Sequence, residues 1–430
     1  MVLWSAWRSQ LNNPQGLLAR QAIESLRAGV PNATAVDALG IDQPAILKTF
    51  SLRLEILQSR SHEQIPGFII EGGFGSGKSH VLKFLSNVAS KRGLASSTVV
   101  VSKETPLSDL STVYRSAISN LEFSDGRVGG SLAEIFYRLD NRSAQYKTFL
   151  DDVRSVESEL DPLFHASLLL FERYRADLEI VEKLVDFWDG GKAQITEWKR
   201  LLRDLEFGYP TIKTVSEKQL SAERFTFATL AMRAAGVKGW IIAIDEIELV
   251  AKFSLRSRGL AYGTLGKLLG VTKSRGKSAL RLIDTIVVGA ITPDLIGELF
   301  RTRDDRNELL RRYEHDAEYL EAAFVGIDSL TTMEAVQPIA ESNDEQLHHV
   351  NESVRRLYRS AYPEHDIPDE LPAGISAASA GRSMRQSIRG WIAYWDLKRA
   401  DPVYEPSIVA DLVHYDLSED AKLEMAAIDE

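Results

Sequence analysis

The chain carries a run of residues that could bind the phosphates of a nucleotide. This run consists of Gly72, Gly73, Phe74, Gly75, Ser76, Gly77, Lys78 and Ser79, and it is followed by His80. Glycines at these positions let backbone N–H groups turn inward around a triphosphate. Lys78 can bridge the terminal phosphates, and the Ser79 hydroxyl can ligate Mg²⁺ at the start of a helix. We therefore expect a nucleotide site at Gly72–His80.

A pair of acidic residues follows a second apolar segment. The run Trp240–Ile244 is typical of a strand buried inside a sheet, and Asp245 and Glu246 come directly after it. Ligands bind at the C-terminal ends of strands in open α/β sheets. Asp245 would hold Mg²⁺ through water, and Glu246 would orient or activate the attacking water. Many buried strands end in a solvated acid, so this pair indicates a nucleotide site only together with the phosphate-binding loop.

Three further residues could sense the γ-phosphate. Thr292 directly follows the apolar run Thr285–Ile291. This is the position that the sensor 1 residue has in AAA+ ATPases, although Thr292 could also simply end the strand. Arg385 and Arg389 lie four residues apart, on one face of a predicted helix. Either could act as a sensor 2 arginine, and the alternative is a solvated or acid-paired arginine pair.

Two other arginine pairs have open roles. Arg311 and Arg312 lie beyond the Thr292 strand, where AAA+ rings present an arginine finger to the neighbouring subunit. Arg256 and Arg258 could contact nucleic acid, a neighbouring subunit or only water. Charge runs are usually solvated faces, so all four stay candidates.

The elements around these residues predict an α/β fold with a five-stranded parallel sheet between helices. Strands are expected at Phe68–Ile70, Thr98–Val101, Trp240–Ile244, Thr285–Ile291 and Ala323–Ile327. Residues 15–58 and 79–92 have helical patterns. The long separation between Lys78 and Asp245 exceeds what one helix and one strand need, so we expect an insertion there.

The predicted domain organisation has four parts. They are an N-terminal helical segment (1–60), a P-loop ATPase core (61–330) with a helical insertion (131–235), a helical lid (331–400) and an acidic tail (401–430). The insertion could serve packing or contact with a partner, and the sequence does not choose between these.

Composition narrows the class of protein. The 430 residues carry a formal net charge of −10, which argues against a general coating of nucleic acid but leaves room for a local basic surface. The absence of cysteine excludes disulfides, thiolate zinc sites and thiol catalysis. No apolar run approaches the roughly 20 residues that span a bilayer. We expect a cytoplasmic protein without membrane contact.

Several segments together resemble one family. They are Arg20–Pro31, the phosphate-binding loop with His80, Asp245–Glu248, Ala290–Asp294 and Met384–Leu397. In order and content they are similar to the ATP-binding proteins of bacteriophage-exclusion (BREX) defence systems, the BrxC/BrxD-like AAA+ P-loop ATPases. The resemblance implies ATP and Mg²⁺ as cofactors, other defence-system proteins as partners, and an AAA+ fold. It also raises the expectation of double-stranded DNA as a partner, and of a homo-oligomer, either ring or dimer.

Three functions stay open at this point. The first is an ATPase that couples hydrolysis to work in a defence complex. The second is a nucleotide-gated scaffold with little hydrolysis. The third is a DNA loader that resembles origin-recognition ATPases, although the stretch after Arg389 is too short for their winged-helix domain. DNA contact would then come from the core, the insertion or an assembled ring.

Overall fold

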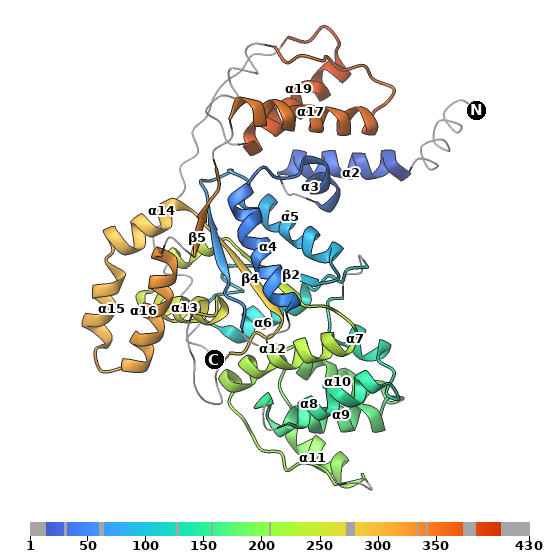
Figure 1. Ribbon diagram of the computed structural model, residues 1–430, viewed down its shortest axis with the longest axis vertical. Coiled ribbons are helices and arrows are strands. Elements are labelled where there is room, and N and C mark those ends of the chain that lie inside the picture. Colours follow the sequence, from blue (N-terminus) through green and yellow to red (C-terminus); the bar gives the residue numbers. More distant parts are fainter. Residues whose placement is uncertain are drawn as a thin grey trace. The chain divides into compact units, whose positions relative to one another are not determined.

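The computed structural model of the protein contains a parallel β-sheet (Figure 1). It describes residues 14–29, 32–59, 64–125, 129–155, 158–205, 208–271, 280–332, 335–340, 343–372 and 384–405. Five strands form the sheet, in the order β2-β3-β4-β1-β5. Their bounds are β1 Phe68–Glu71, β2 Ala95–Val100, β3 Trp240–Asp245, β4 Thr285–Ile291 and β5 Val336–Pro338. The expected α/β class and parallel five-stranded sheet are confirmed.

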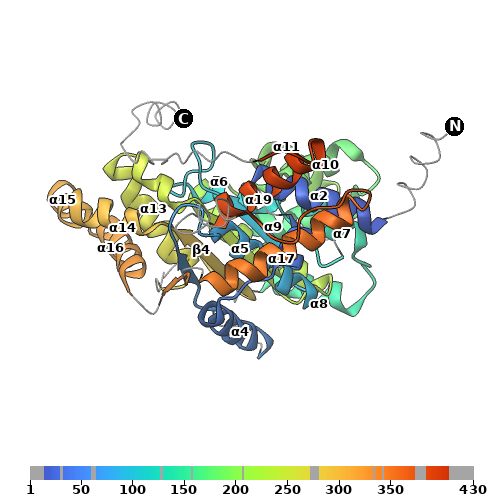
Figure 2. The same ribbon diagram turned by 90° about the horizontal axis from the view of Figure 1, so that it is seen from above.

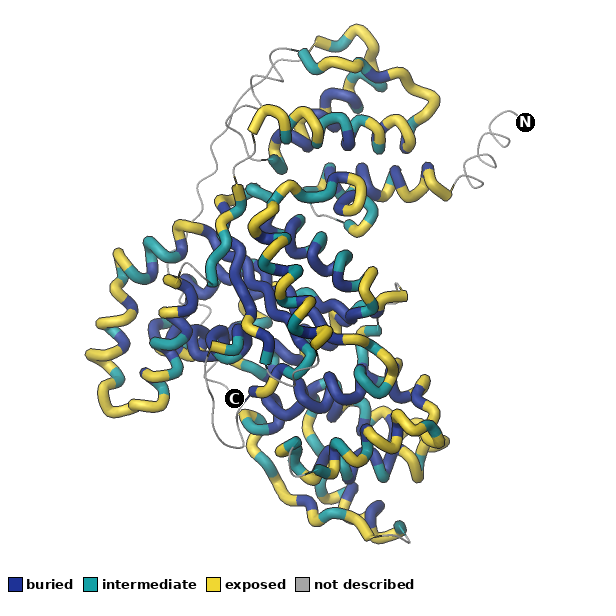
Figure 3. The backbone as a smooth tube through the Cα atoms, viewed as in Figure 1, coloured by how far each residue is buried: buried dark blue, intermediate teal, exposed yellow. Residues whose placement is uncertain are grey.

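The central strands are buried along their whole length. Every residue of β3 and β4 is buried, as the dark strands in Figure 3 show. β3 pairs in parallel with β2 on one side and with β4 on the other. Continuous apolar runs are the pattern of strands covered on both faces, which is why the runs at Trp240 and Thr285 predicted strands correctly.

The described residues divide into two compact units. The P-loop unit comprises residues 14–47, 70–87 and 338–405, and the sheet unit comprises residues 48–69 and 88–337. Each unit has its own hydrophobic core among the described residues.

The sheet unit carries most of the helices. Before β3 these are α6 Leu110–Ser119, α7 Ala133–Arg138, α8 Ala144–Arg154, α9 Pro162–Arg173, α10 Leu178–Asp189, α11 Ile195–Arg203 and α12 Glu217–Ala234. After β3 come η2 Ile247–Lys252, α13 Leu255–Leu268, α14 Pro293–Ile296, η3 Gly297–Thr302, α15 Asp305–Tyr313 and α16 Ala317–Thr331. The described part of 131–235 is thus helical, and its aromatic side chains pack into one core with the sheet.

One predicted strand is wrong. Ala323–Ile327 lies inside the helix α16, and the fifth strand is β5 instead. Leu320, Ala323, Ile327 and Leu330 are buried at spacings of three and four residues, which is the period of a helix. α13 and α16 lie together in Figures 1 and 2.

α16 can approach α13 closely because Gly326 has no side chain. A Cβ at Gly326 would lie 1.9 Å from the backbone oxygen of Tyr262 in α13. Such a distance is far inside van der Waals contact, so any side chain at this position would push the two helices apart. The helical packing thus explains a glycine within a run that has the composition of a strand.

Arg258 is not a surface residue. Its guanidinium forms a bidentate pair with Asp305, in which Nε and Nη2 each donate over 2.7 Å, and Tyr262 donates to the same carboxylate over 2.6 Å. Arg258 is 3% exposed and Asp305 is fully buried. The expectation that Arg258 contacts nucleic acid, a neighbouring subunit or water is therefore wrong. The pair joins the start of α15 to α13, and because it is buried, removing either partner would leave an uncompensated buried charge.

The other arginine candidates lie at the surface. Arg256, Arg311 and Arg312 are exposed, and the latter two pair with Glu308 on their own helix. Such exposed pairs contribute little to stability.

The P-loop unit joins helices from both ends of the described chain. It holds α2 Pro14–Ala28, α3 Ala33–Leu39, α17 Asp344–Ala361, α19 Met384–Ala400, and the first part of both α4 Pro44–Gln58 and α5 Lys78–Lys91. α2 packs against α3, α17 and α19. Ile23, Tyr358 and Trp395 are buried in their common core. The predicted lid helices therefore share a core with the N-terminal helices.

No described helix has both the length and the hydropathy needed to cross a membrane.

Candidate nucleotide-binding site

The phosphate-binding loop connects a buried strand to a helix. β1 ends at Glu71, and α5 begins at Lys78. Gly75 and Gly77 have φ angles of +76° and +100°, which side chains rarely tolerate, so these two glycines are required by the backbone. A Cβ at Gly72 would lie 2.4 Å from Ser76 Oγ. The glycine spacing thus has a direct structural reason at three positions.

Lys78 lies across the inside of this loop. Its side chain is buried, and Nζ donates a hydrogen bond to the backbone oxygen of Gly72 over 3.1 Å. Ser76 Oγ is also buried, and it has no hydrogen-bond partner among the described residues. A triphosphate fits this set of groups, because it would meet an ammonium group, a hydroxyl donor and the N–H groups at the start of α5.

His80 connects the first turn of α5 to the N-terminal helices. Its Nε2 donates to the backbone oxygen of Gly40 over 2.8 Å, and since a carbonyl only accepts, the proton lies on Nε2. Burial lowers the pKa of His80, with a smaller opposing effect from the Gly40 carbonyl. His80 therefore stays neutral at pH 7 and holds the chain that follows α3.

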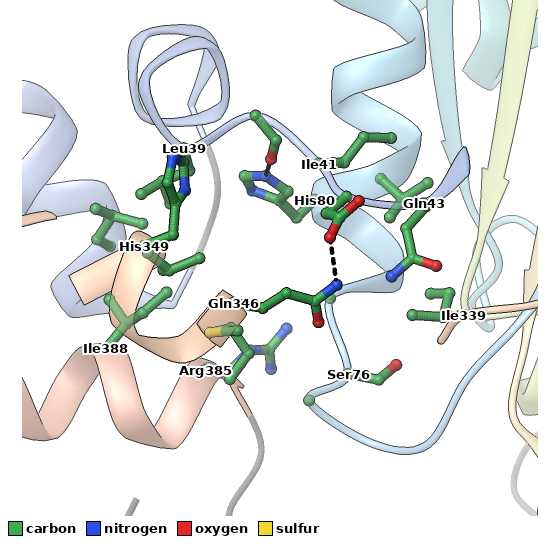
Figure 4. A pocket seen from close by; sticks show the side chains of 18 of the residues that line it. Leu39, Ile41, Gln43, Ser76, His80, Ile339, Gln346, His349, Arg385 and Ile388 are labelled. Atoms are coloured by element: carbon green, nitrogen blue, oxygen red, sulfur yellow. Dashed lines mark hydrogen bonds between the residues drawn. The ribbon is translucent and has the colours of Figure 1, made fainter. Parts of the chain in front are cut away.

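A pocket of about 810 Å³ opens beside the loop. All of its lining residues belong to the P-loop unit. They come from the phosphate-binding loop and α5, from α2 and α3 and the connections that follow these two helices, from Ile339 after β5, and from α17 and α19 (Figure 4). Leu39, Ile41 and Ile388 give it an apolar part, while Ser76 and Ser79 lie at its loop side. A cavity of this size and mixed polarity is typical of a small-molecule site.

The structure separates the two candidate sensor arginines. Arg385 lines the pocket, its backbone N approaches the Gly75 oxygen at 3.5 Å, and its guanidinium lies 5.6 Å from the centre of the Phe74 ring. Arg389 is exposed and is not among the residues that line the pocket. Only Arg385 is therefore positioned to reach a ligand bound in this pocket.

In the sheet unit, the acidic pair lies at the end of β3. Asp245 is 8% exposed, and its Oδ1 accepts a hydrogen bond of 2.9 Å from the Glu246 backbone N. Glu246 has φ 58° and ψ 34°, a left-handed conformation that is costly for a residue with a side chain. Such strain, about 1–3 kcal/mol, persists where the surroundings enforce it and is concentrated at functional sites.

Ile247 is one cause of this enforced turn. It begins η2, and a Cβ at Gly289 of β4 would lie only 2.8 Å from Ile247 Cδ1. The bare backbone of Gly289 thus leaves room for Ile247 to pack down onto β4, which fixes the residue that follows Glu246.

Thr292 lies at the end of the neighbouring strand. It directly follows β4 and is 8% exposed, and its side chain makes no capping hydrogen bond to α14. Because β3 and β4 run in parallel side by side, Asp245 and Thr292 emerge at the same edge of the sheet.

The sequence analysis did not predict several residues that line the pocket. Gly40, Ile41, Asp42 and Gln43 line the pocket from the connection between α3 and α4, and Gln346 lines it from α17. The sequence offers a turn signal, since a glycine lies shortly before Pro44, and a capping box at the start of α17. Neither signal indicates a pocket.

The sheet, the glycine-rich loop at the end of β1 and the adjacent pocket define a P-loop nucleotide-binding protein. A family model described as BREX system ATP-binding protein BrxC/D matches residues 17–371 of the chain. The chain belongs to this family, as the sequence resemblance predicted. It is accordingly an ATP-binding protein of an anti-phage defence system. No curated protein matches the chain.

Proposed function

We propose that this protein is an AAA+ type ATPase that hydrolyses ATP with Mg²⁺ in its defence complex. The observation that carries the proposal is the 810 Å³ pocket beside a phosphate-binding loop whose lysine is already turned inward. A second observation supports the proposal: the acidic pair lies at the end of β3, which belongs to the same parallel sheet as β1. Parallel strands place their C-terminal ends at one edge, where ligands bind.

The residues divide into binding and reacting groups. The loop from Gly72 to Ser79, with Lys78, would bind the phosphates. Mg²⁺ takes oxygen ligands and commonly binds through one or two protein groups plus substrate phosphates, which fits Ser79 and Asp245. When bound, Mg²⁺ would neutralise the charge that develops on the phosphates. Glu246 would orient the attacking water, and Thr292 would hydrogen-bond to the γ-phosphate.

Arg385 would link the position of the predicted lid to the presence of the nucleotide. It belongs to α19, which shares a core with α2, α3 and α17, and it lines the pocket. A charge-assisted hydrogen bond from Arg385 to a phosphate would join this helical core to the ligand. Arg389 is exposed and does not line the pocket, so it would take no part in binding the nucleotide.

A nucleotide-gated scaffold is the second candidate, and one observation favours it. The pocket takes walls from α17, from α19 and from the end of α3, so ATP would contact three helices of this shared core at once. Such binding could order a partner-binding surface without turnover. In this case ATP would be retained for long periods while phosphate release stays negligible.

We further propose that the protein acts with other defence-system proteins, with double-stranded DNA and as a homo-oligomer. We propose these partners because the chain belongs to the family. Binding to the phosphates of DNA would weaken steeply as salt rises. Loss of that salt dependence, or of binding altogether, would remove DNA from the account and with it the loader function.

The test compares the parent chain with Lys78→Ala. We expect the parent to bind ATP with Mg²⁺ and release phosphate, and the variant to lose both because the bridging ammonium is gone. Each protein is assayed with and without double-stranded DNA, with its oligomeric state recorded. Turnover by Lys78→Ala at the parental rate would refute this site, whereas tight binding without turnover by the parent would favour the scaffold.

A further inference from the structure

Four residues between α3 and α4 form one wall of the pocket. We name this segment the strap: Gly40, Ile41, Asp42 and Gln43, all of which line the cavity. α3 ends at Leu39, and Gly40 then takes a φ of +63°, a conformation that suits glycine. The chain can therefore turn sharply out of α3 and run along the pocket before α4 begins.

Side chains from three places hold the strap. From α5, His80 Nε2 donates to the Gly40 oxygen over 2.8 Å. From α17, Gln346 Nε2 donates to Asp42 Oδ2 over 2.5 Å, the contact drawn in Figure 4. From the strap itself, Gln43 reaches the segment after β5: Ala340 N donates to Gln43 Oε1 over 2.8 Å, and Gln43 Nε2 donates to Ala340 O over 3.3 Å.

Gln346 is itself fixed in orientation. Its Oε1 accepts from the backbone N of Asn343, and Asn343 Oδ1 accepts from the backbone N of Gln346, which closes a capping box at the start of α17. Both ends of the Gln346 amide are thus engaged, one with its own helix and one with Asp42. The first turn of the lid helix α17 is therefore tied to the strap.

Through these contacts the strap connects α5, the helix that follows the phosphate-binding loop, to α17. His80 lies one position after Ser79, so the Gly40 anchor begins directly at the loop. Asp42 and Gln43 continue the connection to α17 and to the chain that leads into it. None of these side chains belongs to the reacting groups proposed above, so their effect should fall on how firmly the pocket holds its ligand.

We propose that Asp42, Gln43 and Gln346 are positioning residues that set how long nucleotide stays in the pocket. The inference rests on the proposed function, in which this pocket binds ATP. With the anchors in place, the strap and α17 form a closed wall beside the ligand. When an anchor is lost, the wall opens more often and the nucleotide leaves faster, while the hydrolytic step at saturating ATP keeps its rate.

The test follows release of a fluorescent ATP analogue from the full chain by stopped flow. Asp42→Ala and Gln43→Ala should each release it roughly 3- to 10-fold faster, as expected for the loss of one hydrogen bond or a short pair. Asp42→Asn keeps an oxygen acceptor for Gln346 and should restore near-parental release. Gln21→Ala, an exposed glutamine of α2, is the matched control and should match the parent.

Steady-state turnover separates positioning from chemistry. We expect KM for ATP to rise in Asp42→Ala and Gln43→Ala with kcat unchanged. Gln43→Glu keeps the acceptor for Ala340 N and loses the donor, so it serves if Gln43→Ala folds poorly. Parental release rates in the folded strap variants would overturn the inference while leaving the ATP site intact. Absence of binding by the parent chain would overturn the ATP site and the role of the strap together.

Discussion

Arg385 and Arg389 lie one helical turn apart and have different surroundings. Arg385 lines the pocket beside Phe74, and Arg389 is exposed. If Arg385 donates to a phosphate of ATP, its replacement by alanine should remove a charge-assisted hydrogen bond, which weakens ATP binding roughly 10-fold or more. Arg389→Ala should stay within about 2-fold of the parent. Isothermal titration with ATP and Mg²⁺ measures both, and equal effects would contradict the assignment.

His80 should make stability depend on pH. Burial lowers its pKa in the folded protein below the ordinary value of 6.5, so the unfolded chain binds more protons just below that pH. Its contribution to stability is therefore fully present above about pH 6.5 and is lost as the pH falls below that value and through the lower pKa of the folded protein. Urea unfolding from pH 8 to pH 5 should show a smaller loss for His80→Gln, which cannot titrate. Parallel pH profiles of the parent and the variant would refute this role.

At the scale of single residues, the sequence was informative wherever the motif is local. The glycine-rich loop and the acidic pair could be located because their spacing alone implies a strand, a turn and a helix. The choice between Arg385 and Arg389 could not be made, because both face the same side of a helix. Which of them lines the pocket depends on how α19 packs in its core, and that core includes residues distant in the sequence, such as Ile23 and Tyr358.

Among the elements, the close packing of α13 and α16 gives a sharp prediction. Gly326→Ala should destabilise the protein by about 1–3 kcal/mol or more, because its Cβ would lie 1.9 Å from the Tyr262 oxygen. Gly390 in α19 is the matched control, since a Cβ there would meet nothing within 4 Å. Gly390→Ala should stabilise by about 0.5–1 kcal/mol. Unfolding midpoints followed by circular dichroism test both, and an unaffected Gly326→Ala would contradict this packing.

The sequence predicted the type of an element correctly where its pattern was long, and incorrectly where the pattern was short. The runs that became β3 and β4 are long, continuous and rich in branched residues. Ala323–Ile327 is a short apolar run, and such a run fits a buried helix as well as a buried strand. β5 spans only Val336–Pro338 and ends in a proline, so it has no periodic signal that a sequence could reveal.

Across the whole molecule, the ends of the described chain meet in one core. Arg27 of α2 donates from Nε and Nη2 to the two carboxylate oxygens of Asp396 in α19, each over 3.0 Å. A double-mutant cycle of Arg27→Ala and Asp396→Ala should give a coupling energy of about 0.5–1 kcal/mol, modest because both groups are partly exposed. Thermal unfolding of the four proteins measures it. Strict additivity would mean that this pair does not tie α2 to α19.

The sequence could not predict that α2 shares a core with α17 and α19, and the reason is physical. The helical patterns of α2, α17 and α19 are each visible in the sequence, but an amphipathic face does not specify which partner covers it. More than 300 residues separate Arg27 from Asp396, and no local signal connects them. The strap depends on the same long-range packing, so its part in the pocket wall could not be predicted either.

The most direct test of the account measures ATP retention and phosphate release by Glu246→Gln. The account predicts that this variant binds ATP like the parent but scarcely hydrolyses it, because the loop and Lys78 remain while the group that orients water is lost. ATP should then stay bound through gel filtration. Phosphate release at the parental rate by Glu246→Gln would contradict the claim that the residue at this strained turn after β3 serves catalysis.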